Sequence, residues 1–346
     1  MKTILTLLLA CGISTLALAQ DDRTPYSTQS LANDAISSVR VLTSAGGILV
    51  SGEAGQQPRI DVYIRGNNNR DLSKDEIKRR LDENFDMSIT VNNRELQAIV
   101  KNKHDHIDWN EDGLSISFKI YVPQDVATDL KTSGGGIHLD HLKGNEQFST
   151  SGGGLEINTV NGTIHGTTSG GGIDVKNSGD NINLVTSGGG IRAENCSGDI
   201  SLRTSGGGLE LNDLKGTIHA TTSGGGIRGE NVEGELITST SGGGIDLRNM
   251  NCSLDAHSSA GSVSVQVKQV GKYLKLDTSA GNIDLELPLK QGLSLNITAD
   301  RINQHPFNIS DFTGDWDKNH IKGTVNGGGA QVDANANSGH IDVRFN

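Results

Sequence analysis

The sequence is poor in the side chains that usually fill a protein core. Phe, Trp and Tyr together make up 3% of the 346 residues, and hydrophobic residues of all kinds make up 34%. Aromatic side chains bury the largest areas in ordinary cores, so a thick globular core is not expected. Burial must instead come from Ile, Leu and Val in a thin core.

Basic residues are also scarce relative to acidic ones. The chain has 30 Lys and Arg against 41 Asp and Glu, which gives a net charge of −11, and no stretch is dense in Lys or Arg. Nucleic-acid binding depends on basic side chains that neutralise phosphates. The sequence therefore predicts no nucleic-acid partner.

Long apolar runs are confined to the N-terminus. Lys2 precedes the apolar stretch ILTLLLACGISTLALA, which ends in Ala-Leu-Ala, so residues 1–19 are predicted to be a signal peptide cleaved after Ala19. An alternative hypothesis is a lipobox with lipidation of Cys11. No later run reaches ~18 apolar residues, so no transmembrane segment is predicted in the mature chain. The predicted location is the periplasm, the outer surface or the extracellular space.

Glycine, in contrast, is abundant and falls in strict register. The motif Thr-Ser-Gly-Gly-Gly followed by Ile or Leu returns at a constant interval and holds 21 of the 46 glycines. Degenerate copies follow at Ser258 and Thr278. We number the positions of each repeat from its first residue, position 1, which is Thr132, Thr150, Thr168, Thr186, Thr204, Thr222 or Thr240.

Apolar residues recur two apart within each repeat, which is strand periodicity. Position 6 always holds Ile or Leu, position 8 is usually apolar with Gly229 as an exception, and position 15 holds Ile or Leu from Ile164 to Leu254. One such unit cannot bury its own apolar face, so neighbouring copies must stack. The predicted fold is all-β, a parallel β-solenoid with about 18 residues per coil and a rise of ~4.8 Å per coil.

The glycine triplets are predicted to be structural turns at one corner of each coil. We expect positive φ angles there, which glycine adopts at little cost. The other corner has Asn or Asp at position 10 of most repeats, and these residues tolerate the left-handed conformation. The predicted turn glycines are Gly134, Gly135, Gly136, Gly152, Gly170, Gly188, Gly206, Gly224 and Gly242.

Less regular segments flank the repeats and are predicted to cap the solenoid, because bare end coils would expose unpaired strand edges. The sequence suggests four parts after the signal peptide. They are a disordered linker over 20–35, a mixed N-terminal β cap over 36–131, the repeat solenoid over 132–289 and a C-terminal β-solenoid cap over 290–346.

One short helix is predicted within the N-terminal cap, near residues 73–85. Ser73 and Glu76 have the spacing of a capping box. Ile77, Leu81 and Phe85 recur at every fourth position and share one helical face. This helix is expected to pack on the sheet or to cover its edge.

Charged residues at position 7 alternate in sign along the repeats. Neighbouring coils lie close enough for cross-strand pairing, so we predict a structural charge ladder that favours the correct register. The arginines in this column exclude a repeated calcium site, and the absence of a second threonine column disfavours ice binding. The predicted ladder is Asp174, Arg192, Glu210, Arg228 and Asp246.

Cysteine is rare, and Cys196 and Cys252 alone follow the predicted signal peptide. An exported pair invites a disulfide. Cys252 lies three coils beyond Cys196, which separates the two by ~14 Å. A disulfide needs Cα atoms within ~7 Å, so we predict two buried free thiols.

The segment KHDHIDWNEDG, residues 103–113, gathers typical metal-ligand side chains. His104, His106 and Asp108 are the candidate ligands. The competing interpretation is a polar connection between two strands, which needs no ligand and which we favour. We therefore predict no metal and no cofactor.

The stretch SFKIYVPQDVATDLKTSGGGIHL, the repeats and the terminal NGGG…NSGHIDV resemble a bacterial adhesin-like family of unknown function, domain of unknown function 4097. Head-domain autotransporter adhesins are similar. The resemblance extends over residues 36–346. It implies an envelope or extracellular β-solenoid with no assigned catalytic residues.

Three functions remain open from the sequence. The favoured hypothesis is a non-enzymatic, adhesin-like or scaffolding surface that binds a surface glycan or an envelope protein. The alternative is a periplasmic module in envelope-stress signalling or assembly. A polysaccharide-acting enzyme is a distant third, because the repeats carry no insertions and no recurring carboxylate cluster.

Overall fold

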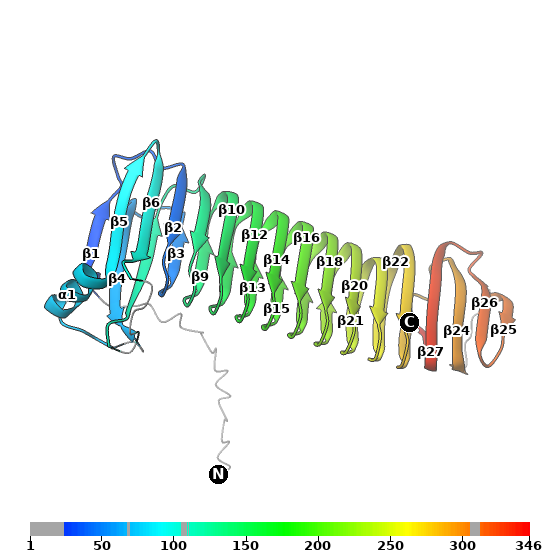
Figure 1. The fold of residues 1–346 in the computed structure, drawn as a ribbon. Helices are drawn as coiled ribbons and strands as arrows, with labels where there is room; N and C mark the ends of the chain where they lie inside the picture. The colour runs from blue at the N-terminus through cyan, green and yellow to red at the C-terminus, as the bar shows by residue number, and fades with distance from the viewer. Residues whose placement is uncertain (1–23, 68–69, 105–108, 110, 305–311) are drawn as a thin grey trace, which may run out of the picture.

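The computed structural model describes residues 24–67, 70–104, 109, 111–304 and 312–346. These residues form 27 β-strands and one short α-helix, and the predicted parallel β-solenoid is confirmed. Figure 1 shows an elongated stack of coils with helix α1 at one end and strands β25 and β26 at the other. The predicted signal peptide and Cys11 lie outside the described residues. No helix in the described ranges is long and apolar enough to cross a membrane.

Each complete repeat contributes a short strand at positions 6–9 and a longer strand that begins at position 12. Both pair in parallel with the equivalent strand of the next repeat, as Ile173 does with Ile191. The short strands are β9 (Ile137–Asp140), β11 (Leu155–Asn158), β13 (Ile173–Lys176), β15 (Ile191–Glu194), β17 (Leu209–Asn212) and β19 (Ile227–Glu230).

The long strands form the opposite wall of the solenoid. At the end of the array, β21 and β22 are single strands that run through both walls. The coil of β22 is longer than the preceding coils, so that Leu254 pairs with Leu274. This group consists of β8 (Ala127–Lys131), β10 (Lys143–Thr150), β12 (Asn161–Thr168), β14 (Gly179–Thr186), β16 (Ser197–Thr204), β18 (Lys215–Thr222), β20 (Glu233–Thr240), β21 (Ile245–Ser258) and β22 (Val263–Thr278).

The core is the thin layer between these two walls. Side chains at positions 6 and 8 enter it from the short strands, and side chains at positions 15 and 17 enter it from the long strands. Phe148 occupies position 17 beside Gly166, where an added Cβ would collide with the Phe148 ring. A large residue in one coil is thus matched by a small one in the next, as close packing requires.

The glycine corner is built differently from our prediction. No glycine of the seven triplets has a φ in the left-handed region, whereas position 10 does at Asn177, Asn195 and Asn231. The middle glycine is required for another reason. A Cβ on Gly171 would lie under 3.0 Å from the backbone of Gly153 in the preceding coil. The corners of successive coils are therefore in direct contact, and hydrogen is the side chain that fits between them.

Position 1 ties each corner to the previous coil. The Thr168 hydroxyl donates to the carbonyl oxygen of Gly153 at 2.7 Å and accepts from the amide of Gly171 at 3.3 Å. The same pair of bonds recurs at Thr150 and Thr222. These threonines are buried, so the hydroxyl replaces the water that the corner backbone would otherwise need.

At the N-terminal end, the stacking order departs from the chain order. The coil formed by β2 (Ser38–Leu42) and β3 (Ile48–Ser51) lies between β6 and β7 on one side and β8 and β9 on the other. Antiparallel partners then extend both walls. The remaining strands of this end are β1 (Ser27–Ser30), β4 (Arg59–Gly66), β5 (Phe85–Asn92), β6 (Glu95–Asn102) and β7 (Leu114–Tyr121).

Strand β1 corrects the predicted disordered linker over 20–35. Residues Ser27–Ser30 pair antiparallel with β4, and Thr28 donates a hydrogen bond from its hydroxyl to Asp61 at 2.7 Å. Leu31, directly after the strand, is fully buried. The polar composition of this segment concealed a strand because all four of its side chains are exposed and leave no apolar alternation in the sequence.

Helix α1 (Lys74–Asn84) confirms the predicted helix near 73–85. Ser73 is the N-cap, and its side-chain oxygen accepts a hydrogen bond from the amide of Glu76 at 3.2 Å. Ile77, Leu81 and Phe85 are buried beneath it. The helix contacts strands β4, β5 and β7, so it covers the end of the core.

The C-terminal end repeats the out-of-order stacking. The last coil, β27 (Ala330–Phe345), pairs with β22 and with β23 (Ile283–Leu287) on one side and with β24 (Leu293–Gln304) on the other. Figure 1 shows β27 next to β22, with β24 outside it. The antiparallel strands β25 (Phe312–Trp316) and β26 (His320–Val325) finish the stack.

Cys196 and Cys252 are free and buried, as predicted. Burial raises the pKa of the Cys252 thiol to about 12, so it remains protonated at neutral pH. We expect a thiol-specific reagent to leave the native protein unlabelled and to label both cysteines after unfolding in urea, with intact mass as the measurement. Rapid labelling of either thiol in the native protein would contradict this burial.

Candidate functional site

A long open hollow runs along the short-strand wall of the solenoid. Its volume is about 900 Å³, and it spans the coils from Gly154 to Ser264. The six coils from Gly154 to Gly244 each contribute the third glycine, at position 5, and a charged residue, at position 7, and the last coil contributes Ser262 and Ser264. We call this hollow the trough. Smaller hollows continue it at both ends, toward His138 on one side and Glu286 on the other.

Backbone forms one side of the trough, because glycine leaves no side chain to fill it. The position-5 carbonyls are used within the stack: the amide of Leu155 donates to Gly172 O and that of Ile173 to Gly190 O, both at 3.0 Å. The position-5 amides differ, since no described residue accepts a hydrogen bond from them. These amides, ~4.8 Å apart along the stack, belong to Gly154, Gly172, Gly190, Gly208, Gly226 and Gly244.

Charged side chains line the trough beside this row of amides. The structure brings the five predicted ladder residues into one column as direct strand neighbours. Not all of their ion pairs join neighbouring coils. Arg192 pairs with Glu210 of the next coil at 3.2 Å, whereas Asp174 pairs with Lys176 and Asp246 with Arg248 of their own strands.

Reversing one charge of the ladder is expected to weaken the fold slightly. Arg192→Glu would place a carboxylate between Asp174 and Glu210, and we expect the free energy of unfolding to fall by about 1 kcal/mol, measured by urea denaturation at low salt. Arg203→Glu is the matched control, because its strand neighbours are Val185 and Thr221. Equal stability of the two variants would contradict a role for the ladder in stability.

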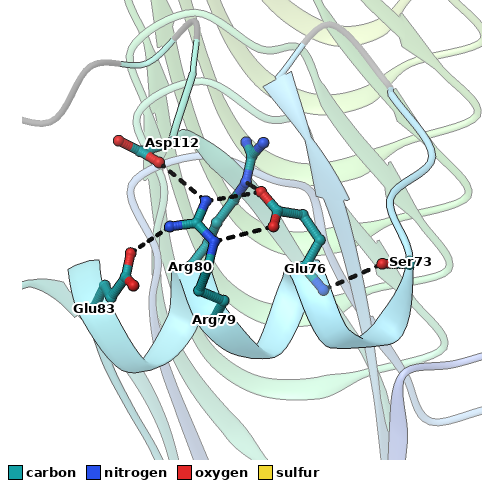
Figure 2. Close-up of polar contacts among 6 residues, drawn as sticks. All are labelled: Ser73, Glu76, Arg79, Arg80, Glu83 and Asp112. Atoms are coloured by element: carbon teal, nitrogen blue, oxygen red, sulfur yellow. Dashed lines mark hydrogen bonds and ion pairs between the residues drawn. The ribbon is translucent and has the colours of Figure 1, made fainter.

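The candidate metal site is only partly within the described residues. His104 is exposed, while His106 and Asp108 lie outside the described part of the chain. Nearby Asp112 faces Arg79 of helix α1 at 3.6 Å (Figure 2). Among the described residues, no group of three His, Cys, Asp or Glu side chains could hold a metal ion.

Helix α1 carries a compact network of charges that involves this same segment. Figure 2 shows Arg79 between Glu76, Glu83 and Asp112, with Arg80 also bound to Glu76. Hydrogen bonds from the two arginines lower the pKa of Glu76 to about 2. This network fastens the segment before β7 to the helix. Its charges are thus satisfied within the protein.

One buried titratable residue escaped the sequence analysis. Glu146 occupies position 15, the core position that holds Ile164 in the next coil, and it is fully buried. One carboxyl oxygen accepts a hydrogen bond from Thr128 at 2.6 Å, while the other lacks a partner in the described residues. Burial raises the pKa of Glu146 to about 7. A Glu in an otherwise apolar column was the signal that could have revealed it.

The fold and the trough together define the class of protein: a solenoid of stacked, near-identical short coils with a polar hollow along one wall. The model of the family described as Toastrack DUF4097 matches residues 50–344. The chain therefore belongs to the Toastrack family, and the predicted resemblance to domain of unknown function 4097 is confirmed.

A crystal structure from Clostridium sporogenes ATCC 15579, provisionally described as a cell adhesion protein, is similar to this chain. The two are 11% identical, and the match covers 92% of this chain and 98% of the other with a TM-score of 0.21. At these values the likeness says nothing of what this chain binds. No curated protein sequence matches the chain.

Proposed function

We propose that this protein is an exported, non-enzymatic and adhesin-like binding protein of the cell envelope or extracellular space. The trough is the observation that carries the proposal. It is long, open and repeated coil by coil, as a surface for an extended polymer should be. Export is supported by the signal-peptide pattern of residues 1–19.

The shape of the trough favours a polymer over a small molecule. Small-molecule sites are concave pockets that enclose most of their ligand. The trough instead repeats the same lining, a glycine and a charged side chain, in coil after coil. A ligand gains from such repetition only if it spans several coils, because each contact by itself is weak.

The test is to block the trough and measure polymer binding. Glu210→Cys places a thiol in the trough, and His219→Cys places one on the exposed long-strand face of the same coil. Each new thiol is coupled to a maleimide polyethylene glycol. Cys196 and Cys252 will not react with this reagent, because both are buried. Binding of residues 20–346 is then measured to immobilised neutral glycans, acidic glycans and polypeptides.

We expect at least one polymer class to bind the unlabelled protein and the His219→Cys conjugate, and to be lost from the Glu210→Cys conjugate. Thermal melts of both conjugates show that the fold is retained. Equal binding by the two conjugates would move the binding surface away from the trough. Failure of every polymer class to bind would overturn the proposed function.

A further inference from the structure

The outer surface of the short-strand wall carries two columns of charge. Positions 7 and 9 of each coil lie on the same side of their strand, because residues two apart share a face. Positions 6 and 8 enter the core, so positions 7 and 9 point outward. Wherever both positions are charged within the trough, their signs are opposite. The pairs are Asp174 with Lys176, Arg192 with Glu194, Arg228 with Glu230 and Asp246 with Arg248.

The signs also alternate from coil to coil. Position 7 changes sign at every coil from Asp174 to Asp246, and position 9 does the same except at the neutral Asn212. The charges are exposed, since the side chains of Asp174 and Lys176 are 41% and 39% accessible. Exposed ion pairs contribute little to stability. A partner with the opposite arrangement of charge could therefore engage both columns.

Such a partner must repeat at the step of the coils, which parallel strands set at ~4.8 Å. A second copy of this chain has the same step and carries both signs in equal measure. Figure 1 shows the coils from β9 to β22 in a straight row. Two copies can therefore lie against each other along this whole row.

A two-fold axis parallel to the stack, midway between the two columns, brings two such walls face to face. Rotation about this axis keeps each coil at its own height and reverses the direction of its strands. Position 7 of each coil then meets position 9 of the same coil in the second copy. Such a contact uses one surface twice, so each of the four charged pairs is formed twice across the interface.

No coil of the trough sets like charges against each other in this arrangement. Glu156 and Glu210 each meet an asparagine, and Ser264 meets a glutamine. The first like pair arises beyond the trough, in β23, where Asp284 would meet Glu286. The strand neighbour of Glu286 is Arg344, which offsets part of this negative charge. The surface that is complementary to itself thus coincides with the trough.

We propose that two copies of this protein associate trough to trough about this axis, as a weak and reversible homodimer. Weak association follows from the polar surface, because charge pairs across an interface set orientation and partner more than affinity. The dimer goes beyond the proposed function and does not rest on it. It covers the trough, so a second copy and a bound polymer exclude each other.

The first test is sedimentation velocity of residues 20–346 over a range of concentrations. We expect a monomer–dimer equilibrium at about 0.1 M salt that weakens at least about tenfold at about 1 M salt, where the Debye length falls to about 3 Å. A monomer at every concentration up to about 1 mM would overturn the dimer. A dimer that is insensitive to salt would overturn pairing by charge.

Two charge variants test the arrangement of the pairs. A basic variant carries Asp174→Lys with Asp246→Lys, and an acidic variant carries Lys176→Asp with Arg248→Asp. Each variant alone sets like charges together in two coils and should dimerise at least about tenfold more weakly than the native protein. An equal mixture restores opposite charges at these contacts and should form a heterodimer, although both variants keep a net negative charge.

Asp199→Lys is the matched control, because Asp199 is exposed on the long-strand wall, and it should dimerise like the native protein. A mixture of the basic and acidic variants that stays monomeric would overturn the proposed axis. Native-strength dimerisation of either variant alone would place the contact outside the trough. Thermal melts show that each variant folds.

The polyethylene glycol conjugates provide a second test of the surface if a charge variant does not fold. The conjugate at Glu210→Cys should be monomeric, and the conjugate at His219→Cys should still dimerise. A dimer of the Glu210→Cys conjugate would overturn contact through the trough. These measurements use no polymer ligand, so failure of the dimer leaves the proposed function intact, and failure of every polymer to bind leaves the dimer intact.

Discussion

Gly171→Ala should unfold far more easily than the native protein, although it adds only one methyl group. The new Cβ would meet the backbone of Gly153 and Gly154 in the preceding coil at under 3.0 Å. Neither Gly171 nor the backbone of the preceding coil can move away, because hydrogen bonds between the parallel strands hold both coils in place. We expect the free energy of unfolding to fall by at least about 4 kcal/mol, the range seen when a tightly packed site cannot relax.

Gly170→Ala is the matched control in the same corner. Its Cβ would lie 3.4 Å from the nearest backbone oxygen, an ordinary van der Waals contact. A glycine replaced without strain can even stabilise by about 0.4–1 kcal/mol, because the unfolded chain loses freedom. Urea denaturation followed by circular dichroism compares the two variants. Equal midpoints would show that close approach of the coils is not what demands glycine.

Raising the pH should destabilise the native protein through Glu146. The buried carboxyl has its pKa raised from 4.5 to about 7 by desolvation. The folded state therefore holds a proton that the unfolded state has released between these two values, and stability falls as the pH rises from about 4.5 to about 7. The loss is roughly 3 kcal/mol, at about 1.36 kcal/mol per unit of pKa, and is constant above that range.

Glu146→Gln removes the charge and keeps an oxygen that can accept the hydrogen bond from Thr128. We expect this variant to match the native protein near pH 4 and to exceed it by roughly 3 kcal/mol at pH 8. Glu53→Gln, at an exposed position, should leave the pH profile unchanged. A constant difference between native protein and Glu146→Gln across this pH range would show that Glu146 does not titrate in the folded state.

Much of the solenoid follows from residues close together in the sequence. Ile173, Val175 and Ile182 mark the inward positions of one coil, and the return of the same pattern in the next repeat sets the coil length. Strand alternation needs only the local chain. The helix near residue 77 was equally local, because its cap and its apolar face lie within one short segment, from Ser73 to Phe85.

Contacts across the trough were less predictable. The column of charges at position 7 was visible in the sequence, but the partners were not: Asp174 reaches Lys176 on its own strand instead of Arg192 in the next coil. Long side chains choose between neighbours at similar distances, and the choice depends on geometry that the repeat pattern does not contain. The trough itself is a hollow lined by several coils, and no single residue type in the sequence indicates it.

The sequence by itself determined the coil: its length, its inward columns and the places of its corners, since each coil meets the next in the same way. Only the tertiary structure decided the order of the coils at the ends. There, residues 38–51 and 330–345 are stacked between segments that do not flank them in the sequence. It also decided why Gly171 must be glycine. Both depend on contacts between distant segments, and such contacts leave no periodic trace along the chain.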